Sequence, residues 1–217
     1  MPRQGESAVT SEADAARGSR EAGPEEGRRV FAIVLAAGRA TRFGSAKQLA
    51  AFDGAPLVVR AVRLAESVCG THSVLVAGHE WQPVVAACAP LQGFFVNNSE
   101  HAEGMGSSIA SGTRSIMHVA DAVLLLLCDQ PLVRRDHLER LLAVSRQDPG
   151  RIVASAYAGT AGPPILFPRR WFGDLAALQG DRGAREILEQ APDDVRVVTV
   201  EEAAIDIDRP EDLRELQ

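Results

Sequence analysis

Short apolar runs alternate along this chain with stretches in which apolar side chains recur at helical spacing. Residues 30–35 (VFAIVL) and 121–128 (DAVLLLLC) are runs of the first kind, which are typical of strands buried on both faces. Residues 56–68 form a stretch of the second kind, with one apolar face. The predicted strands are residues 30–35, 73–77, 93–97, 121–128, 151–157, 165–167 and 194–200, and the predicted helices are residues 56–68, 81–88, 107–118, 136–145, 183–190 and 210–216.

This alternation of strands and helices indicates an α/β fold. It favours a mainly parallel sheet covered by helices on both faces, because each crossover is right-handed and lays its helix against the sheet. The carboxyl ends of the strands then meet along one edge, and ligands bind outside that edge in such folds. The residues that follow the predicted strands are therefore the first candidates for chemistry.

Composition and charge narrow the range of functions. Apolar residues make up 46% of the 217 residues and charged residues 24%, an ordinary balance for a globular protein. No uncharged apolar stretch is long enough to cross a membrane, so we expect no membrane partner. The formal net charge is −6 and no run is rich in Lys and Arg, which argues against nucleic acid as a partner.

The cysteines and the N-terminal segment are interpreted structurally. Cys69, Cys88 and Cys128 are widely spaced and form no metal-binding pattern, so we expect buried small side chains in a reducing compartment, the cytoplasm. Residues 1–29 contain almost no large apolar side chain. We expect a disordered N-terminal extension there, followed by one domain over residues 30–217.

The loop after the first strand has the composition of a phosphate-binding turn. Ala36, Ala37 and Gly38 are small enough for close approach of a ligand to the backbone, and Arg42 and Lys47 add positive charge. Neither the dinucleotide fingerprint nor the P-loop pattern of ATPases is present. The alternative is a flexible connector with two solvated cations.

Three aspartates stand where strands are expected to end. Asp129 follows the most apolar strand, where an ionised carboxylate needs a partner or a cation such as Mg²⁺. Asp206 and Asp208 share one face of an extended segment and are candidates for completing such a site. The alternatives are a turn at Asp129 and an N-cap of the last helix at Asp208.

Two helix starts carry further polar groups. Gly106, Ser107 and Ser108 offer N–H groups and hydroxyls to an anion, although a capping role explains Ser107 equally well. Arg182 and Arg185 are placed to clamp a phosphate, or else to be solvated at a capped helix start.

Five segments taken together resemble the MobA-like nucleotidyltransferase family, and within it the molybdenum cofactor cytidylyltransferase branch. They are residues 35–47 (LAAGRATRFGSAK), 104–109 (GMGSSI), 128–131 (CDQP), 180–185 (GDRGAR) and 206–213 (DIDRPEDL), in the expected order. The resemblance implies a three-layer, Rossmann-like fold of the nucleotide-diphospho-sugar transferase type, with residues 30–217 as the nucleotidyltransferase domain. It implies Mg²⁺ as cofactor and transfer of CMP from CTP to the phosphate of molybdopterin cofactor, with release of pyrophosphate. A molybdenum hydroxylase or its maturation factor is a further implied partner.

The resemblance also implies roles for individual residues. Leu35, Ala36, Ala37, Gly38, Gly106, Ser107 and Ser108 would contact the nucleotide, and Ala37 goes with the cytosine-using branch. Arg42 and Lys47 would neutralise the triphosphate as catalytic residues. Asp129 would bind the metal together with Asp206 or Asp208, and Asp181, Arg182 and Arg185 would contact the acceptor.

Two positions depart from the family pattern. Ala40 replaces a Ser in the first loop, and Pro163 replaces a His before Pro164. The second change bears on recognition of the acceptor. Two alternatives therefore remain open: a related nucleotidyltransferase with another phosphate acceptor, and a non-catalytic accessory protein that binds the cofactor during maturation of a molybdenum hydroxylase.

Overall fold

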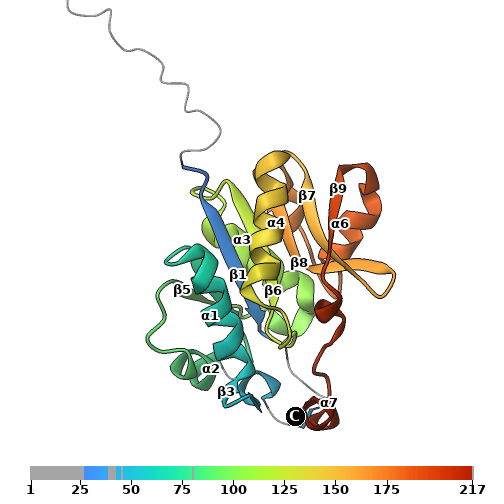
Figure 1. Cartoon of the computed structure of the whole chain (residues 1–217). Helices are drawn as coiled ribbons and strands as arrows, with labels where there is room; N and C mark the ends of the chain where they lie inside the picture. Colours follow the sequence, from blue (N-terminus) through green and yellow to red (C-terminus); the bar gives the residue numbers. More distant parts are fainter. Residues whose placement is uncertain (1–26, 39–42, 45, 80, 217) are drawn as a thin grey trace, which may run out of the picture.

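The computed structural model describes residues 27–38, 43–44, 46–79 and 81–216, and a seven-stranded sheet forms its centre (Figure 1). The strands lie in the order β5-β4-β1-β6-β8-β7-β9, and a two-stranded sheet of β2 and β3 is separate. The strands are β1 (Val30–Ala36), β2 (Ala51–Phe52), β3 (Ala55–Pro56), β4 (Ser73–Ala77), β5 (Phe94–Asn97), β6 (Ala122–Leu127), β7 (Ile152–Tyr157), β8 (Thr160–Pro168) and β9 (Val195–Thr199). The helices are α1 (Leu57–Cys69), α2 (Trp81–Ala87), α3 (Met105–Ile116), α4 (Arg135–Gln147), α5 (Phe172–Ala176), α6 (Ala184–Gln190) and α7 (Pro210–Glu215).

The sheet is mainly parallel, which confirms the predicted fold class. β1 pairs in parallel with β4 and β6, β4 with β5, and β7 with β9. Only β8 runs against its neighbours, because it pairs antiparallel with both β6 and β7. Ala158 and Gly159, with φ of 46° and 75°, form the tight turn that reverses the chain between β7 and β8.

Strand β8 is longer than the sequence pattern predicted. Its first half contains Gly162, Pro163 and Pro164, residue types that are uncommon inside strands. The pairing with β7 shifts between Ala154 and Ser155, opposite the two prolines. A bulge of this kind leaves prolines unpaired without ending the strand.

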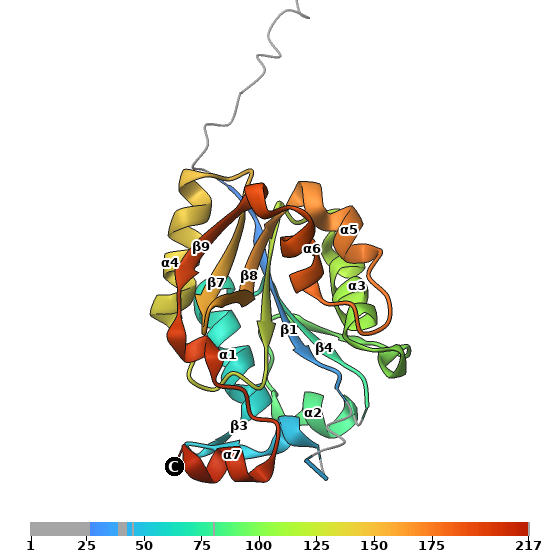
Figure 2. The ribbon, with the colours of Figure 1, turned by 90° about the vertical axis from the view of Figure 1, so that its right-hand side faces the viewer.

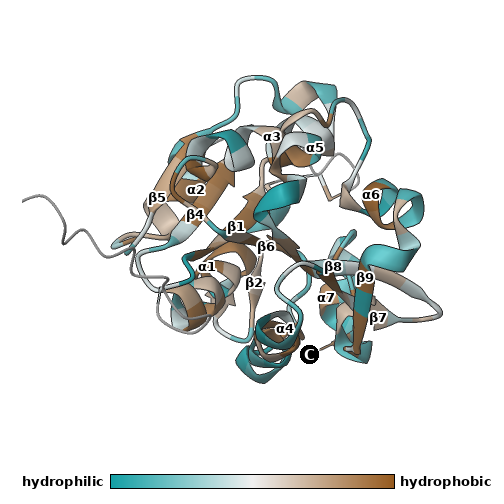
Figure 3. Ribbon diagram, turned by 90° about the horizontal axis from the view of Figure 1, so that it is seen from above, coloured by the Kyte–Doolittle hydropathy of each residue, from teal (hydrophilic) through white to brown (hydrophobic). Residues whose placement is uncertain are grey.

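The side chains of the strands alternate between two apolar cores, one on each face of the sheet. On one face, Val34 and Leu124 pack with α1 and α4, and on the other, Ile33 and Leu125 pack with α3, α5 and α6. Figure 2 shows the resulting three layers edge-on, with the sheet between the two sets of helices. In Figure 3 the strands are mostly brown, while teal residues lie on the outer helices and loops, as expected for a sheet buried on both faces.

Two small elements were not predicted. Helix α5 follows β8 and buries Phe172 and Leu175, and the β2–β3 hairpin buries Phe52 beneath α7. None of the helices in the described part of the chain has the length and apolar character needed to span a bilayer.

Candidate active site

The segments that follow β1 and β6 leave the sheet side by side. The two strands pair in parallel with Leu35 beside Leu127, so the turn at Gly38 and the segment that begins with Cys128 emerge at the same edge. An open pocket of about 490 Å³ lies at this edge. Of the predicted site residues, those lining it are Leu35, Ala36, Ala37, Gly38, Lys47, Ser108, Asp129, Asp181 and Asp208.

Lys47 and Asp129 are in direct contact in this pocket. Lys47 belongs to a short 3-10 helix, Lys47–Leu49, and its Nζ lies 2.7 Å from Asp129 Oδ2 and 3.1 Å from Asp208 Oδ1. The side chains of Lys47 and Asp129 are only 13% and 22% exposed. Burial by itself lowers the pKa of Lys47, but the charges and hydrogen bonds of the two aspartates outweigh it and raise the pKa above its ordinary value.

Asp206 is the third carboxylate of this group. Loss of hydration and the neighbouring charges of Asp129 and Asp208 raise the pKa of Asp206 to about 6. Asp208 contacts Lys47, while the N-cap residue of α7 is Arg209. The carboxylate of Asp212 accepts the backbone N–H groups of both Asp208 and Arg209. The alternative prediction that Asp208 is the N-cap of the last helix was therefore wrong, because Arg209 occupies the N-cap position of α7.

The donor set has the character of a partial site for a hard cation. Asp129 Oδ1 is buried and has no hydrogen-bond partner among the described residues. A buried carboxylate oxygen without a partner is costly unless a cation or donor reaches it. Within the described ranges no three His, Cys, Asp or Glu side chains come close enough to hold a metal by themselves. A Mg²⁺ ion here would thus depend on substrate oxygens as well, which is its usual behaviour with phosphates.

Gln48 shapes the turn after β1. Its side-chain amide is buried and donates to the backbone oxygens of Ala36, at 3.1 Å, and Gly38, at 2.5 Å. These bonds hold the exposed Gly38 against Gln48, which follows Lys47 in the sequence, so that Gly38 and Lys47 line the same pocket. Sequence reasoning missed Gln48 because a lone amide carries no motif.

The start of α3 is occupied largely by internal hydrogen bonds. The Gly106 N–H donates to the carbonyl of Gly180 at 2.9 Å, and the Ser107 hydroxyl lies 2.9 Å from the Gly104 carbonyl oxygen. The amide of Asn98 donates to the hydroxyls of both Ser107 and Ser108. Gly106 and Ser107 thus tie the helix start to its surroundings, and only Ser108 of the three lines the pocket.

The predicted acceptor residues separate. Asp181 lines the pocket, whereas Arg182 pairs with Glu186 at 2.6 Å, one turn along α6. The Arg185 guanidinium donates to the Tyr157 hydroxyl at 3.0 Å. Neither arginine borders this pocket as the chain stands.

Two of the predictions fall on residues that the structure does not describe. Arg42 and residues 1–26 lie outside the described residues.

The pocket wall also contains His101 and Met105, which were not predicted from the sequence to belong to the site. Met105 is an exposed large apolar side chain, and this exposure at a helix start is visible only in the folded chain. The three cysteines form no disulfide, and burial raises the pKa of the Cys128 thiol, as expected for an inert side chain.

Two known proteins have sequences similar to most of this chain. The chain is 31% identical over 168 residues to the purine catabolism protein PucB of Bacillus subtilis. This match covers 74% of this chain and 80% of PucB. It is 35% identical over 174 residues to the bifunctional protein GlmU of Anaeromyxobacter, and spans 35% of that longer protein.

Solved structures share the fold. Rv0371c from Mycobacterium tuberculosis superposes with a TM-score of 0.74 at 28% identity, covering 87% of this chain and 97% of Rv0371c. A nucleotidyl transferase from Methanothermobacter gives a TM-score of 0.74 at 23% identity, covering 88% of this chain and 96% of the other, which is a likeness of fold. The sequence pattern of the MobA-like NTP transferase domain matches residues 32–195. With that match, and with Lys47 and Asp129 facing one another at the edge of the sheet, the chain belongs to the MobA-like NTP transferase family of nucleotidyltransferases.

Proposed function

We propose that this nucleotidyltransferase transfers CMP from CTP to the phosphate of molybdopterin cofactor and releases pyrophosphate. The observation that carries the proposal is the 2.7 Å contact between Lys47 and Asp129 beside the Gly38 turn. A cation and a carboxylate at one point of a pocket are what a triphosphate with a divalent metal requires.

The chemistry needed here is mainly the management of charge. An acceptor phosphate must approach the α-phosphorus of a nucleotide that already carries several negative charges. No covalent protein intermediate is needed, so positioning and electrostatic stabilisation supply the acceleration. Lys47, with its raised pKa, stays protonated at neutral pH and offsets the charge that develops on the leaving pyrophosphate.

The carboxylates fit a divalent metal. Asp129 and Asp208 would hold Mg²⁺, and Asp206 stands close enough to add to the negative potential. The metal, when bound, supplies charge neutralisation between the phosphates. One solved structure of Rv0371c, 27% identical to this chain, is a complex with manganese, which supports the proposal of a divalent metal here.

The nucleotide end of the pocket is formed by the β1 turn. Leu35 to Gly38 would contact base and ribose, and Gln48 keeps the two carbonyls of this turn engaged. The fold accepts CTP in CMP:2-keto-3-deoxy-manno-octonic acid synthetase, which was solved with CTP bound. Our choice of CTP for this chain rests on the Ala37 position and on the resemblance of its segments to the cytidylyltransferase branch.

The acceptor side is the open mouth of the pocket near Asp181 and Met105. We propose that the body of the acceptor lies against the exposed Met105, with Arg182 exchanging Glu186 for the acceptor phosphate. A protein of the same fold from Archaeoglobus fulgidus, 17% identical with a TM-score of 0.63, is named molybdopterin-guanine dinucleotide biosynthesis protein A. Another phosphate acceptor is the second candidate, because Pro163 departs from the family pattern.

The test is a nucleotide and acceptor screen. The purified protein is incubated with each α-labelled nucleoside triphosphate, Mg²⁺ and molybdopterin cofactor, and pyrophosphate and labelled product are measured. Strict dependence on CTP supports the proposal. Thermal stabilisation by CTP and Mg²⁺ without product favours another acceptor, and no stabilisation by any nucleotide favours a non-catalytic accessory protein.

A further inference from the structure

A second hollow lies behind the segment that follows β6. It has a volume of about 360 Å³ and shares Leu127 and Cys128 with the candidate active-site pocket. Its other walls come from α1 and residues 130–134, with Asp53, Ala55, Leu126 and Pro164. An adjoining hollow of about 480 Å³ shares Asp53, Arg60, Pro131 and Arg134 with it. The two hollows together form a surface site separate from the Lys47–Asp129 contact, and we call it the arginine pocket.

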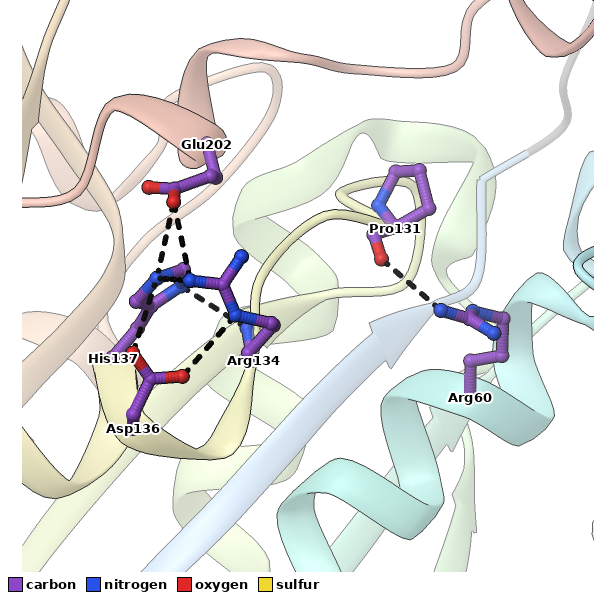
Figure 4. A network of polar contacts seen from close by, with 6 residues as sticks. All are labelled: Arg60, Pro131, Arg134, Asp136, His137 and Glu202. Carbon is purple, nitrogen blue, oxygen red and sulfur yellow. Dashed lines mark hydrogen bonds and ion pairs between the residues drawn. The ribbon is translucent and has the colours of Figure 1, made fainter. Parts of the chain in front are cut away.

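Three guanidinium groups border the arginine pocket: those of Arg60, Arg63 and Arg134. Among the described residues, acidic side chains form ion pairs with Arg60 and Arg134 but not with Arg63. Arg134 faces Asp136 and Glu202, at 3.3 Å each, and these bonds draw it toward the buried His137 (Figure 4). Arg63 is exposed and forms no ion pair with the part of the chain that the structure describes.

Arg60 is the best placed of the three to bind a ligand. Its contacts within the protein are long: 3.3 Å to the carboxylate of Asp53, which is 80% exposed, and 3.5 Å to the Pro131 carbonyl. Its Nε is buried and has no partner among the described residues. The ring of Phe52 lies 5.0 Å below the guanidinium and keeps it in place. Figure 4 shows Arg60 reaching from α1 toward Pro131, on the opposite side of the loop from Arg134.

A guanidinium in this state is suited to an oxyanion. Arg binds phosphate and carboxylate through two parallel N–H groups, and such charge-assisted bonds are shorter and stronger than the contacts that Arg60 makes here. The exposed Asp53 is a weak competitor, because an exposed ion pair contributes little.

The floor of the arginine pocket is apolar. Leu57, Ala61, Leu64 and Val133 line it beneath the guanidinium groups. A pocket with apolar walls and a few convergent polar groups is typical of sites for small organic molecules. Inorganic phosphate would use only the guanidinium groups, whereas an organic anion would also cover the apolar floor.

We propose that the arginine pocket binds a small organic anion, a phosphate or carboxylate carried on an apolar body, at a site separate from the nucleotide pocket. Arg60 and Arg63 hold the anionic group, and the apolar floor between α1 and Val133 holds the body. This proposal stands independently of the proposed cytidylyl transfer, because it shares neither Lys47 nor Asp129 with it.

The experiment measures binding of phenyl phosphate to the full chain by isothermal titration calorimetry at low salt. We expect saturable binding that is tighter than binding of inorganic phosphate and that weakens as salt is added. Arg60→Gln and Arg63→Gln should each weaken binding about tenfold, the scale of losing one charge-assisted hydrogen bond. Arg140→Gln, at an exposed position of α4 outside the pocket, is the matched control and should leave binding unchanged.

Arg63→Gln and Lys47→Ala keep the test decisive. Arg63 is exposed and forms no ion pair with the described residues, so Arg63→Gln remains informative if Arg60→Gln fails to fold. Lys47→Ala separates the two pockets, because it should reduce binding of CTP and leave binding of phenyl phosphate intact. The proposal is overturned if Lys47→Ala abolishes phenyl phosphate binding, if Arg60→Gln and Arg63→Gln bind as wild type, or if no saturable binding is seen at millimolar concentrations.

Discussion

Replacing Asp129 by Asn removes the charge that faces Lys47 and changes little else in shape. Two unit charges 2.7 Å apart at an effective dielectric constant of about 20 attract by about 6 kcal/mol before any cost of desolvation. Removal of one partner of a half-buried pair leaves the other incompletely compensated, but Asp208 remains 3.1 Å from Lys47. We therefore expect Asp129→Asn to lower the free energy of unfolding by about 1–3 kcal/mol.

The same substitution should affect catalysis far more than stability. Losing one preorganised electrostatic group costs about a hundredfold or more in turnover. Lys47→Ala should produce a similar loss, because it removes the cation that opposes the pyrophosphate charge. Asp174→Asn makes the same change of charge at an exposed position of α5 and should leave both quantities unchanged.

Lys47 is the only lysine in the chain, so its ionisation can be followed by itself. Selective isotope labelling of lysine gives one side-chain resonance in the NMR spectrum, and its titration reports the pKa of Lys47. In the wild type this pKa should lie above the ordinary value, since Asp129 and Asp208 favour the charged form. In Asp129→Asn it should fall, because burial then has less opposition. An unchanged pKa of Lys47, or near-normal turnover in Asp129→Asn, would refute the reasoning.

Two other predictions concern the framework of the protein. Gly104 has φ of 122°, and a Cβ there would overlap the Gly180 carbonyl and come within 2.6 Å of Asp181 Oδ1. Gly104→Ala should therefore lower the free energy of unfolding, measured with urea, by at least about 1–3 kcal/mol. Wild-type stability in this variant would show that the loop relaxes freely. Burial keeps His137 neutral and lowers its pKa below 6.5 even though Glu202 opposes this. The unfolded chain then binds more protons at His137 below about pH 6.5, so the His137 contribution to the free energy of unfolding should fall as the pH drops from 7 to 5. Protonation of Asp206, whose pKa is raised to about 6, acts in the opposite direction over the same range. The test is therefore the difference between the two proteins: the free energy of unfolding of the wild type should decrease relative to that of His137→Gln as the pH falls, and identical slopes would contradict the assignment.

The local pattern of the chain was enough to predict most of the elements. Apolar runs such as residues 30–35 and 121–128 are buried strands because both faces of this sheet are covered. The helical spacing of residues 56–68 corresponds to α1, whose apolar face packs on the sheet. These signals depend on side chains that each element must bury, so they are readable without the fold.

The elements that were missed lack such a signal. β8 carries two prolines and a glycine in its first half, and it continues as a strand because Pro163 and Pro164 form a bulge in its pairing with β7. The five-residue helix α5 is too short to show a helical period of apolar side chains. It forms after β8, where Phe172 packs into the core on the face covered by α3, α5 and α6. In both places tertiary packing outweighs the local preference.

The candidate site divides in the same way. The sequence by itself determined that Gly38, Lys47 and Asp129 follow strands, and that small residues and charges gather there, because these are properties of neighbouring positions. Only the tertiary structure decided that Lys47 contacts Asp129, 82 positions away, and that the Gly106 N–H donates to the Gly180 carbonyl. It also decided that Arg182 donates to Glu186 and Arg185 to Tyr157. The physical reason is that strand register and loop packing bring distant segments together, and hydrogen-bond partners are then chosen by distance in space, which spacing along the chain does not encode.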